Sequence, residues 1–160
     1  MKKLLNPFMM FIIGLILGVI SRLLDIYTKN LGNIFSELAI WVLIGVLISI
    51  NSETKKKAMI NIFPFCIGML LTYYFVAFIT NGVYSIDYII GWTIFALFSP
   101  MMAYFTWQSK EDEILSKLIS IGIVLVSVLS SIILFDRLRI YDYIINLILI
   151  YILFSKKVKR

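Results

Sequence analysis

Long runs of sequence without a charged residue constrain the fold of this chain more than any other feature. Six such windows occur, at residues 4–21, 38–52, 58–86, 88–109, 118–135 and 143–155. A membrane-spanning helix needs about 20 mainly apolar residues and at least about 17. The two shortest windows reach that length only if flanking charged residues are included. The pattern predicts six membrane-spanning helices, at approximately 5–24, 34–50, 59–79, 89–107, 114–135 and 138–154.

Composition supports a membrane location. Hydrophobic residues make up 61% of the 160 residues, 15 basic and 9 acidic residues are present, and the mean hydropathy is +0.98. Soluble domains average about 45–50% apolar and about 25% charged residues, so a water-soluble globule is excluded. Asn81-Gly82 is a turn signal that predicts the end of the third span near Ile79. We expect an all-α integral membrane protein in which residues 1–160 form one transmembrane domain.

The distribution of basic residues predicts the topology, because Lys and Arg beside a span mark its cytoplasmic side. With the N-terminus inside, four basic residues lie outside, namely Arg22, Lys29, Arg137 and Arg139. Eleven lie inside, namely Lys2, Lys3, Lys55, Lys56, Lys57, Lys110, Lys117, Lys156, Lys157, Lys159 and Arg160. We therefore expect six spans with both termini cytoplasmic, in the plasma membrane of a bacterial-type cell. The first span could also be a signal peptide, but no A-x-A-like cleavage site follows it, and an uncleaved helix is favoured.

The absence of histidine and the single cysteine, Cys66, exclude several kinds of chemistry. An intramolecular disulfide, a Cys/His zinc site, and Cys-His or Ser-His-Asp catalytic sets all need residues that the chain lacks. We expect a non-enzymatic protein with no catalytic residue, metal or cofactor. A net charge of +6 would normally suggest nucleic acid as a partner, but no basic groove with interleaved aromatic residues is available. The expected partner is the lipid bilayer.

Small residues at helical spacing mark faces where membrane helices pack closely. Gly14, Gly18 and Ser21 lie on one face of the first predicted span, and Asp25 continues that face. The fifth predicted span carries Ser116, Ser120, Ser127 and Ser131. The favoured interpretation is packing within one bundle. The alternative is that these faces receive a partner membrane protein or a second copy of the chain.

Charged and polar residues gather at the predicted outer boundary, whereas the centre of every predicted span is free of charge. The candidate ligand-binding residues there are Arg22, Asp25, Glu37, Arg139, Asp142 and Asn146. Most tyrosines lie in or beside the same loops. One interpretation is an aromatic belt with interfacial salt bridges. The other is an outward-facing vestibule that orients a small polar solute.

The string SRLLDIYTKNLGNIFSELAIWVLIGVLIS, followed by FCIGMLLTYY and GWTIFALFSP, resembles a family of small multi-pass bacterial membrane proteins without an assigned activity. The predicted architecture is also similar to the substrate-binding subunits of energy-coupling-factor vitamin transporters. Those subunits often carry an Ala-xxx-Ala pair on the first helix, where this chain has Gly14 and Gly18. Neither resemblance brings a catalytic or ligand motif.

The sequence therefore favours a non-enzymatic multi-pass membrane protein that binds or helps to move a small polar solute at its outer face. The alternative is an accessory or immunity-type protein that acts by helix packing against another membrane protein.

Overall fold

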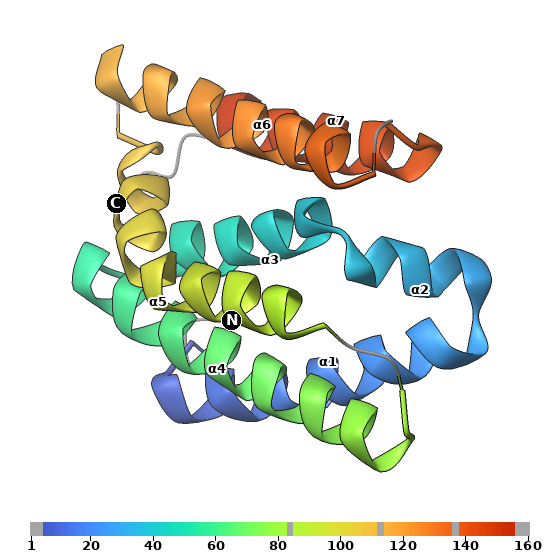
Figure 1. Cartoon of the computed structure of the whole chain (residues 1–160). Helices are drawn as coiled ribbons and strands as arrows, with labels where there is room; N and C mark the ends of the chain where they lie inside the picture. The colour runs from blue at the N-terminus through green and yellow to red at the C-terminus, as the bar shows by residue number, and fades with distance from the viewer. Residues whose placement is uncertain (1–4, 83–84, 112–113, 136–137, 156–160) are drawn as a thin grey trace.

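The computed structural model describes residues 5–82, 85–111, 114–135 and 138–155. Within these ranges the chain forms helices and turns and no strand (Figure 1). The helices are α1 (Pro7–Tyr27), α2 (Lys29–Ser36), α3 (Leu38–Asn51), α4 (Lys55–Ile79), α5 (Ile86–Gln108), α6 (Ile114–Phe135) and α7 (Ile140–Ser155). The predicted all-α class is thus confirmed for the described residues. Lys2, Lys3, Arg137 and the basic residues after 155 lie outside them.

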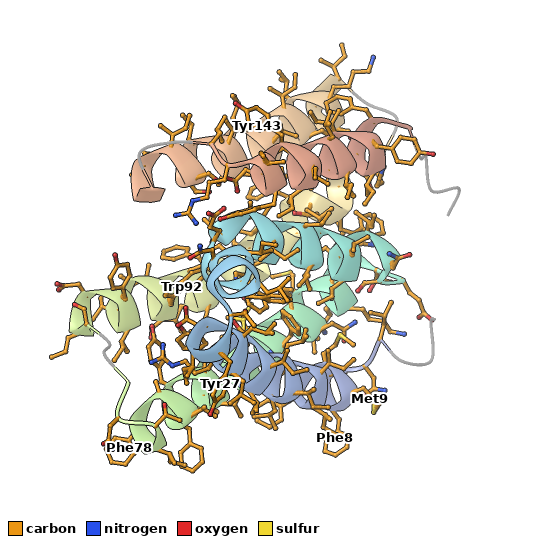
Figure 2. All side chains as sticks on the ribbon, turned by 90° about the vertical axis from the view of Figure 1, so that its right-hand side faces the viewer. Phe8, Met9, Tyr27, Phe78, Trp92 and Tyr143 are labelled. Carbon is orange, nitrogen blue, oxygen red and sulfur yellow. The ribbon has the colours of Figure 1, made fainter. Side chains whose placement is uncertain are left out.

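Four helices, α1, α4, α5 and α6, are long and apolar enough to cross a membrane. The α3 and α7 helices are also apolar but have only 14 and 16 residues. The exterior of the bundle carries many large apolar side chains, including those of Phe8, Phe78 and Tyr143 (Figure 2). Polar groups such as Glu37 and Asp142 are instead fully buried. An apolar exterior around a partly polar interior is the distribution expected of a protein surrounded by lipid.

The short helix α3 lies at the centre of the bundle. It contacts α4 and α5 as well as α6 and α7. Figure 1 shows α6 and α7 side by side above α3, with α1 and α4 below it. Apart from α2, successive helices run in opposite directions, so α1, α4 and α6 finish at the end where α3, α5 and α7 begin. We call this the α2 end, because α2 also lies there (Figure 1).

The predicted second span, 34–50, is not one continuous helix. The α2 helix ends at Ser36, Glu37 has extended backbone angles (φ −91°, ψ 147°), and α3 begins at Leu38. Glu37 makes no side-chain cap on α3; its carboxyl group is bonded instead to residues at the start of α7. The break therefore places an ionisable side chain inside the bundle. The other predicted spans agree with observed helices to within a few residues at each end.

Glycines allow α1 and α4 to approach with backbone against backbone. A Cβ atom on Gly14 would lie 2.2 Å from the carbonyl oxygen of Phe65, and one on Gly18 would lie 2.3 Å from that of Met69. From the other side, a Cβ atom on Gly68 would lie 2.6 Å from the carbonyl oxygen of Phe11. Close approach at small residues is the usual basis of helix association in lipid.

The serine stripe of α6 also packs inside the bundle. Ser116, Ser120, Ser127 and Ser131 of α6 are all buried. The glycine face of α1 is likewise covered by α4. Within this chain both faces are therefore covered by neighbouring parts of the same bundle.

At the end opposite the α2 end, Lys110 fixes the last turn of α7. Its buried ammonium group donates to the carbonyl oxygens of Ile152 and Leu153, the second over 3.0 Å. A cation beside the last carbonyls of a helix also interacts favourably with the helix dipole. This contact joins the turn after α5 to the end of α7.

Candidate functional site

The six candidate residues divide between two places at the α2 end. Arg22 and Asp25 lie on α1 and meet α4. Glu37, Arg139, Asp142 and Asn146 lie where α3 and α7 begin, beside α6. The structure therefore brings four of the six together and places the other two in a separate network.

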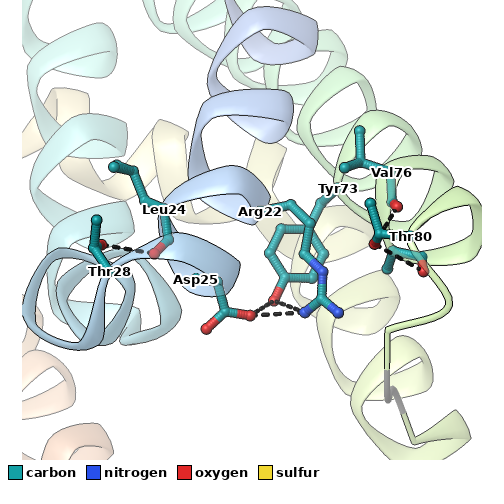
Figure 3. A network of polar contacts seen from close by, with 8 residues as sticks. Arg22, Leu24, Asp25, Thr28, Tyr73, Val76 and Thr80 are labelled. Carbon is teal, nitrogen blue, oxygen red and sulfur yellow. Dashed lines mark hydrogen bonds and ion pairs between the residues drawn. The ribbon is translucent and has the colours of Figure 1, made fainter.

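The Arg22 network joins α1 to α4 and is balanced in charge (Figure 3). Arg22 Nη1 donates to Asp25 Oδ2 over 2.7 Å, and the hydroxyl of Tyr73 donates to the same oxygen over 3.2 Å. The guanidinium also lies over the Tyr73 ring, 5.4 Å from its centroid. One cation, one carboxylate and one phenol bind each other here, although the buried Nε of Arg22 has no hydrogen-bond partner. The contacts indicate a structural clasp between two helices.

The second cluster begins with an ion pair between Glu37 and Arg139. Arg139 Nη1 donates to Glu37 Oε1 over 3.1 Å and to the hydroxyl of Tyr141 over 2.5 Å. The Tyr141 hydroxyl in turn donates to Glu37 Oε1 over 3.2 Å. One carboxylate oxygen of Glu37 is therefore bound by two donors from the start of α7.

Asp142 holds the first turn of α7 and faces α6. The backbone N–H of Arg139 donates to Asp142 Oδ2 over 2.8 Å, which is the contact that an acidic residue makes three positions after a helix N-cap. Ser131 of α6 donates to Asp142 Oδ1 over 3.2 Å. A local helix-start signal thus carries this carboxylate into the bundle.

The carboxyl groups of Glu37 and Asp142 also contact each other. Burial, together with the hydrogen bond and charge of Asp142, raises the pKa of Glu37 to about 8. Glu37 lies between α2 and α3, outside the four candidate spans. Two carboxyl groups that lie together away from water cannot both ionise without a large cost, which is why the pKa of Glu37 lies above its ordinary value.

The cluster therefore contains one more negative than positive group. Glu37 and Asp142 are both 0% exposed, and the side chain of Arg139, which pairs with Glu37, is 22% exposed. Two ionised carboxylates and one guanidinium sum to −1, an unfavourable state for groups removed from water. Uptake of one proton or one singly charged cation neutralises the set.

Three buried oxygens in or beside this cluster have no hydrogen-bond partner when both carboxyl groups are ionised. They are Glu37 Oε2, Ser127 Oγ and Asn146 Oδ1. Because α6 and α7 are antiparallel and Ser131 contacts Asp142, the residues one turn deeper on each helix, Ser127 and Asn146, face the same seam. Unsatisfied buried polar atoms are rare and indicate a missing partner.

Access to the seam is from the α2 end. Arg139 is partly exposed there, whereas Glu37, Asp142 and Asn146 lie behind it with 7% exposure or less. Arg139 and Tyr141 are bonded to each other and to Glu37 Oε1. Arg139 and Tyr141 therefore form the partly exposed side of the cluster.

Sequence reasoning missed part of this site. Tyr141 has no sequence signal beyond its place near the predicted boundary, and the spacing of Ser127 and Ser131 predicts only helix packing. The predicted tyrosine-walled vestibule does not coincide with the apolar cavity of the structure. That cavity has a volume of about 320 Å³, lies among α3, α4, α5 and α6, and is lined by none of the six candidate residues.

Comparison of the chain with protein-family models, with curated proteins and with solved structures finds no match in any of the three. The resemblances described from sequence therefore stay predictions. Among the described residues, no group of three or more His, Cys, Asp or Glu side chains is placed to hold a metal ion. The seam offers two carboxyl groups together with amide and hydroxyl oxygens.

Proposed function

We propose that the protein is a non-enzymatic, six-span plasma-membrane protein of bacterial type that binds, and helps to move, a small solute carrying one ammonium group. The binding site is the seam formed by Glu37, Asp142, Ser127 and Asn146. One observation carries the proposal. A buried cluster lacks one positive charge at the place where three buried oxygens lack hydrogen-bond donors.

The ammonium group follows from the chemistry of what is missing. A protonated primary amine supplies one positive charge and three N–H donors. It can therefore neutralise the carboxyl pair and also satisfy the unpartnered oxygens. A proton alone restores neutrality between Glu37 and Asp142 but leaves Asn146 Oδ1 without a donor. A quaternary ammonium ion balances the charge but donates no hydrogen bond to these oxygens.

The proposed topology places this site near the outer surface. Lys55, the first residue of α4, and Lys110, in the α5–α6 connection, lie at the end opposite the α2 end. Positive charges mark the cytoplasmic side, so the α2 end faces outward in this proposal. In it, α3 and α7 also cross the membrane, supported at their outer ends by the buried Glu37 cluster.

Binding is proposed to exchange the solute for a proton. At neutral pH Glu37 carries the proton that bridges to Asp142, because the pKa of Glu37 is raised to about 8. An entering ammonium group takes the place of that proton, and Arg139 and Tyr141 close over it from the partly exposed side. The negative charge needed for binding is thus created only when the proton leaves.

The test is the thermal stability of the purified protein with a panel of chloride salts at equal ionic strength. At about pH 9 Glu37 is ionised, whereas amines with a pKa near 10.4 stay protonated. Methylammonium should raise the unfolding temperature, because a ligand that binds only the folded state stabilises it by about 2.7 kcal/mol at 100 times its Kd. Tetramethylammonium has the same charge and no N–H donor, and should have no such effect.

Matched variants separate this site from a general salt effect. Glu37→Gln should abolish the methylammonium shift, and Asp25→Asn, which alters the other network of the α2 end, should retain it. Equal stabilisation by methylammonium and tetramethylammonium, or a shift that persists in Glu37→Gln, would contradict the proposed site.

A further inference from the structure

An apolar cavity lies between α3, α4, α5 and α6 and takes no part in the site described above. Its volume of about 320 Å³ lies within the range of about 300–1,000 Å³ that is typical of ligand pockets. Trp41 and Gly45 of α3, Phe65 of α4, Met102 of α5 and Gly122 of α6 belong to its wall. It is separate from the Glu37 cluster, whose residues do not line it.

The hydroxyl and indole donors in the wall of the cavity are already engaged within the protein. The hydroxyl groups of Ser49, Ser99 and Thr106 each donate to a carbonyl oxygen of their own helix, over 2.7, 2.7 and 2.8 Å. Trp41 Nε1 donates to the carbonyl oxygen of Phe35. A bound water needs two to four polar partners, so the chemistry of the wall favours an occupant made of hydrocarbon.

Two glycines keep this space open. A Cβ atom on Gly122 would meet nothing within 4 Å, and one on Gly45 would meet only Ile62 Cδ1 at 3.7 Å. The glycines between α1 and α4 differ, because backbone atoms already fill the space where their Cβ atoms would lie. At Gly122 the missing side chain therefore leaves volume in the cavity and serves no close helix contact.

The cavity opens through the side of the bundle. Its wall includes Met102 and Phe105 of α5 and Val126 of α6, which are 41%, 45% and 52% exposed. Both helices are among the four long enough to cross a membrane. The mouth between them therefore faces the layer that acyl chains occupy, and the molecules that adjoin it there are membrane lipids.

We propose that this cavity binds one acyl chain of a membrane phospholipid, inserted between α5 and α6. An acyl chain is apolar like the wall of the cavity, lies next to its mouth in the membrane, and needs no hydrogen bond. The acyl chain fills a void that would otherwise leave Trp41, Phe65 and Met102 without packing partners on that side. This site is independent of the solute site at the α2 end.

Trp41 supplies a direct probe of occupancy. It lines the cavity and is only 5% exposed, so lipid at the perimeter of the protein does not reach its ring. The full chain with Trp92→Phe and Trp107→Phe keeps Trp41 as its single tryptophan. It is reconstituted into vesicles of phosphatidylcholine whose acyl chains are brominated near the middle, because bromine quenches indole emission on contact. We expect a loss of Trp41 emission relative to vesicles without bromine.

Two glycine variants provide the matched pair. Gly122→Leu places a side chain in the cavity and should restore the Trp41 emission. Gly91→Leu, on α5 and away from the cavity wall, also meets nothing within 4 Å of its Cβ position and should leave the quenching unchanged. Trp41 emission that is the same in brominated and plain vesicles would overturn the proposal.

Two further experiments test whether the acyl chain belongs to a phospholipid and allow for a single-tryptophan variant that does not fold. Quenching by a brominated free fatty acid but not by the brominated phospholipid would overturn the proposal in favour of the free acid. If the single-tryptophan chain does not fold, as judged by circular dichroism, native mass spectrometry of the unsubstituted protein replaces it. One phosphatidylcholine retained per chain, lost in Gly122→Leu and kept in Gly91→Leu, is then the expected result; retention by all three chains contradicts it.

Discussion

The carboxyl groups of Glu37 and Asp142 contact each other inside the helix bundle, and both residues are 0% exposed. They come from the starts of α3 and α7, and Arg139 binds the outer oxygen of Glu37 over 3.1 Å. Two buried carboxyl groups beside one guanidinium make the folded protein sensitive to any change in charge at this point. The first two predictions below follow from that relationship.

Stability should fall as pH rises from about 4.5 to about 8. The pKa of Glu37 is about 8 in the folded chain, against 4.5 for an unperturbed carboxyl, so the folded state holds a proton that the unfolded state releases across this interval. Below the interval both states are protonated, and above it both are ionised. Thermal unfolding in detergent across this range checks the slope.

Glu37→Gln should remove this part of the pH dependence, because the amide is neutral throughout. Glu111→Gln, which alters a partly exposed ion pair with Lys55, should keep it. The same slope in Glu37→Gln as in the unsubstituted protein would show that another group is responsible.

Loss of Arg139 should destabilise the fold strongly at high pH. Arg139→Gln leaves the two buried carboxyl groups without a cation, and breaking a buried pair in this way typically costs about 3–5 kcal/mol. Combining it with Glu37→Gln should recover part of the loss, since only Asp142 then remains charged. Chemical denaturation of the two single variants and the double variant gives the coupling between the residues; additive effects would be evidence against the ion pair.

The α1–α4 contact should not tolerate a methyl group. Gly14→Ala places a Cβ atom 2.2 Å from the Phe65 carbonyl oxygen, and overpacking of this kind typically costs about 1–3 kcal/mol. Gly91→Ala, where nothing lies within 4 Å, is the control and should be neutral or slightly stabilising. Equal unfolding temperatures for the two variants would contradict the packing.

Lys110→Met should loosen the last turn of α7. Hydrogen bonds to a charged group contribute about 1.5–3 kcal/mol, and Lys110 makes two with the carbonyl oxygens of Ile152 and Leu153. Hydrogen exchange followed by mass spectrometry should show faster exchange at the end of α7. Lys117→Met, which removes an exposed lysine of α6, is the control; faster exchange in both variants alike would indicate a general charge effect.

The helices could be predicted from sequence because their signals are local. Charge-free windows place the apolar helices, Asn81-Gly82 marks the end of α4 at Ile79, and Asn81 does adopt a positive φ of 50°. The stripe through Gly14 and Gly18 also predicts a packed face from spacing alone. These features need no knowledge of which helices are neighbours.

The break at Glu37 and the division of the candidate site depend on neighbours far away in sequence. Nothing near Glu37 indicates that Arg139 and Tyr141 will bind its carboxylate and turn it into the bundle. Likewise, the separation of Arg22 from Glu37 follows from the pairing of α1 with α4 and of α3 with α7. Six polar residues at one predicted boundary did not reveal which of them share a site.

The central claim is that an ammonium group takes the place of the proton between Glu37 and Asp142. The most direct measurement is proton release on adding methylammonium chloride to the purified protein in weakly buffered solution near pH 7, below the pKa of Glu37 of about 8. The account predicts a rise in free proton with methylammonium, none with tetramethylammonium, and none from Glu37→Gln. Absence of proton release from the unsubstituted protein, or equal release from Glu37→Gln, would contradict it.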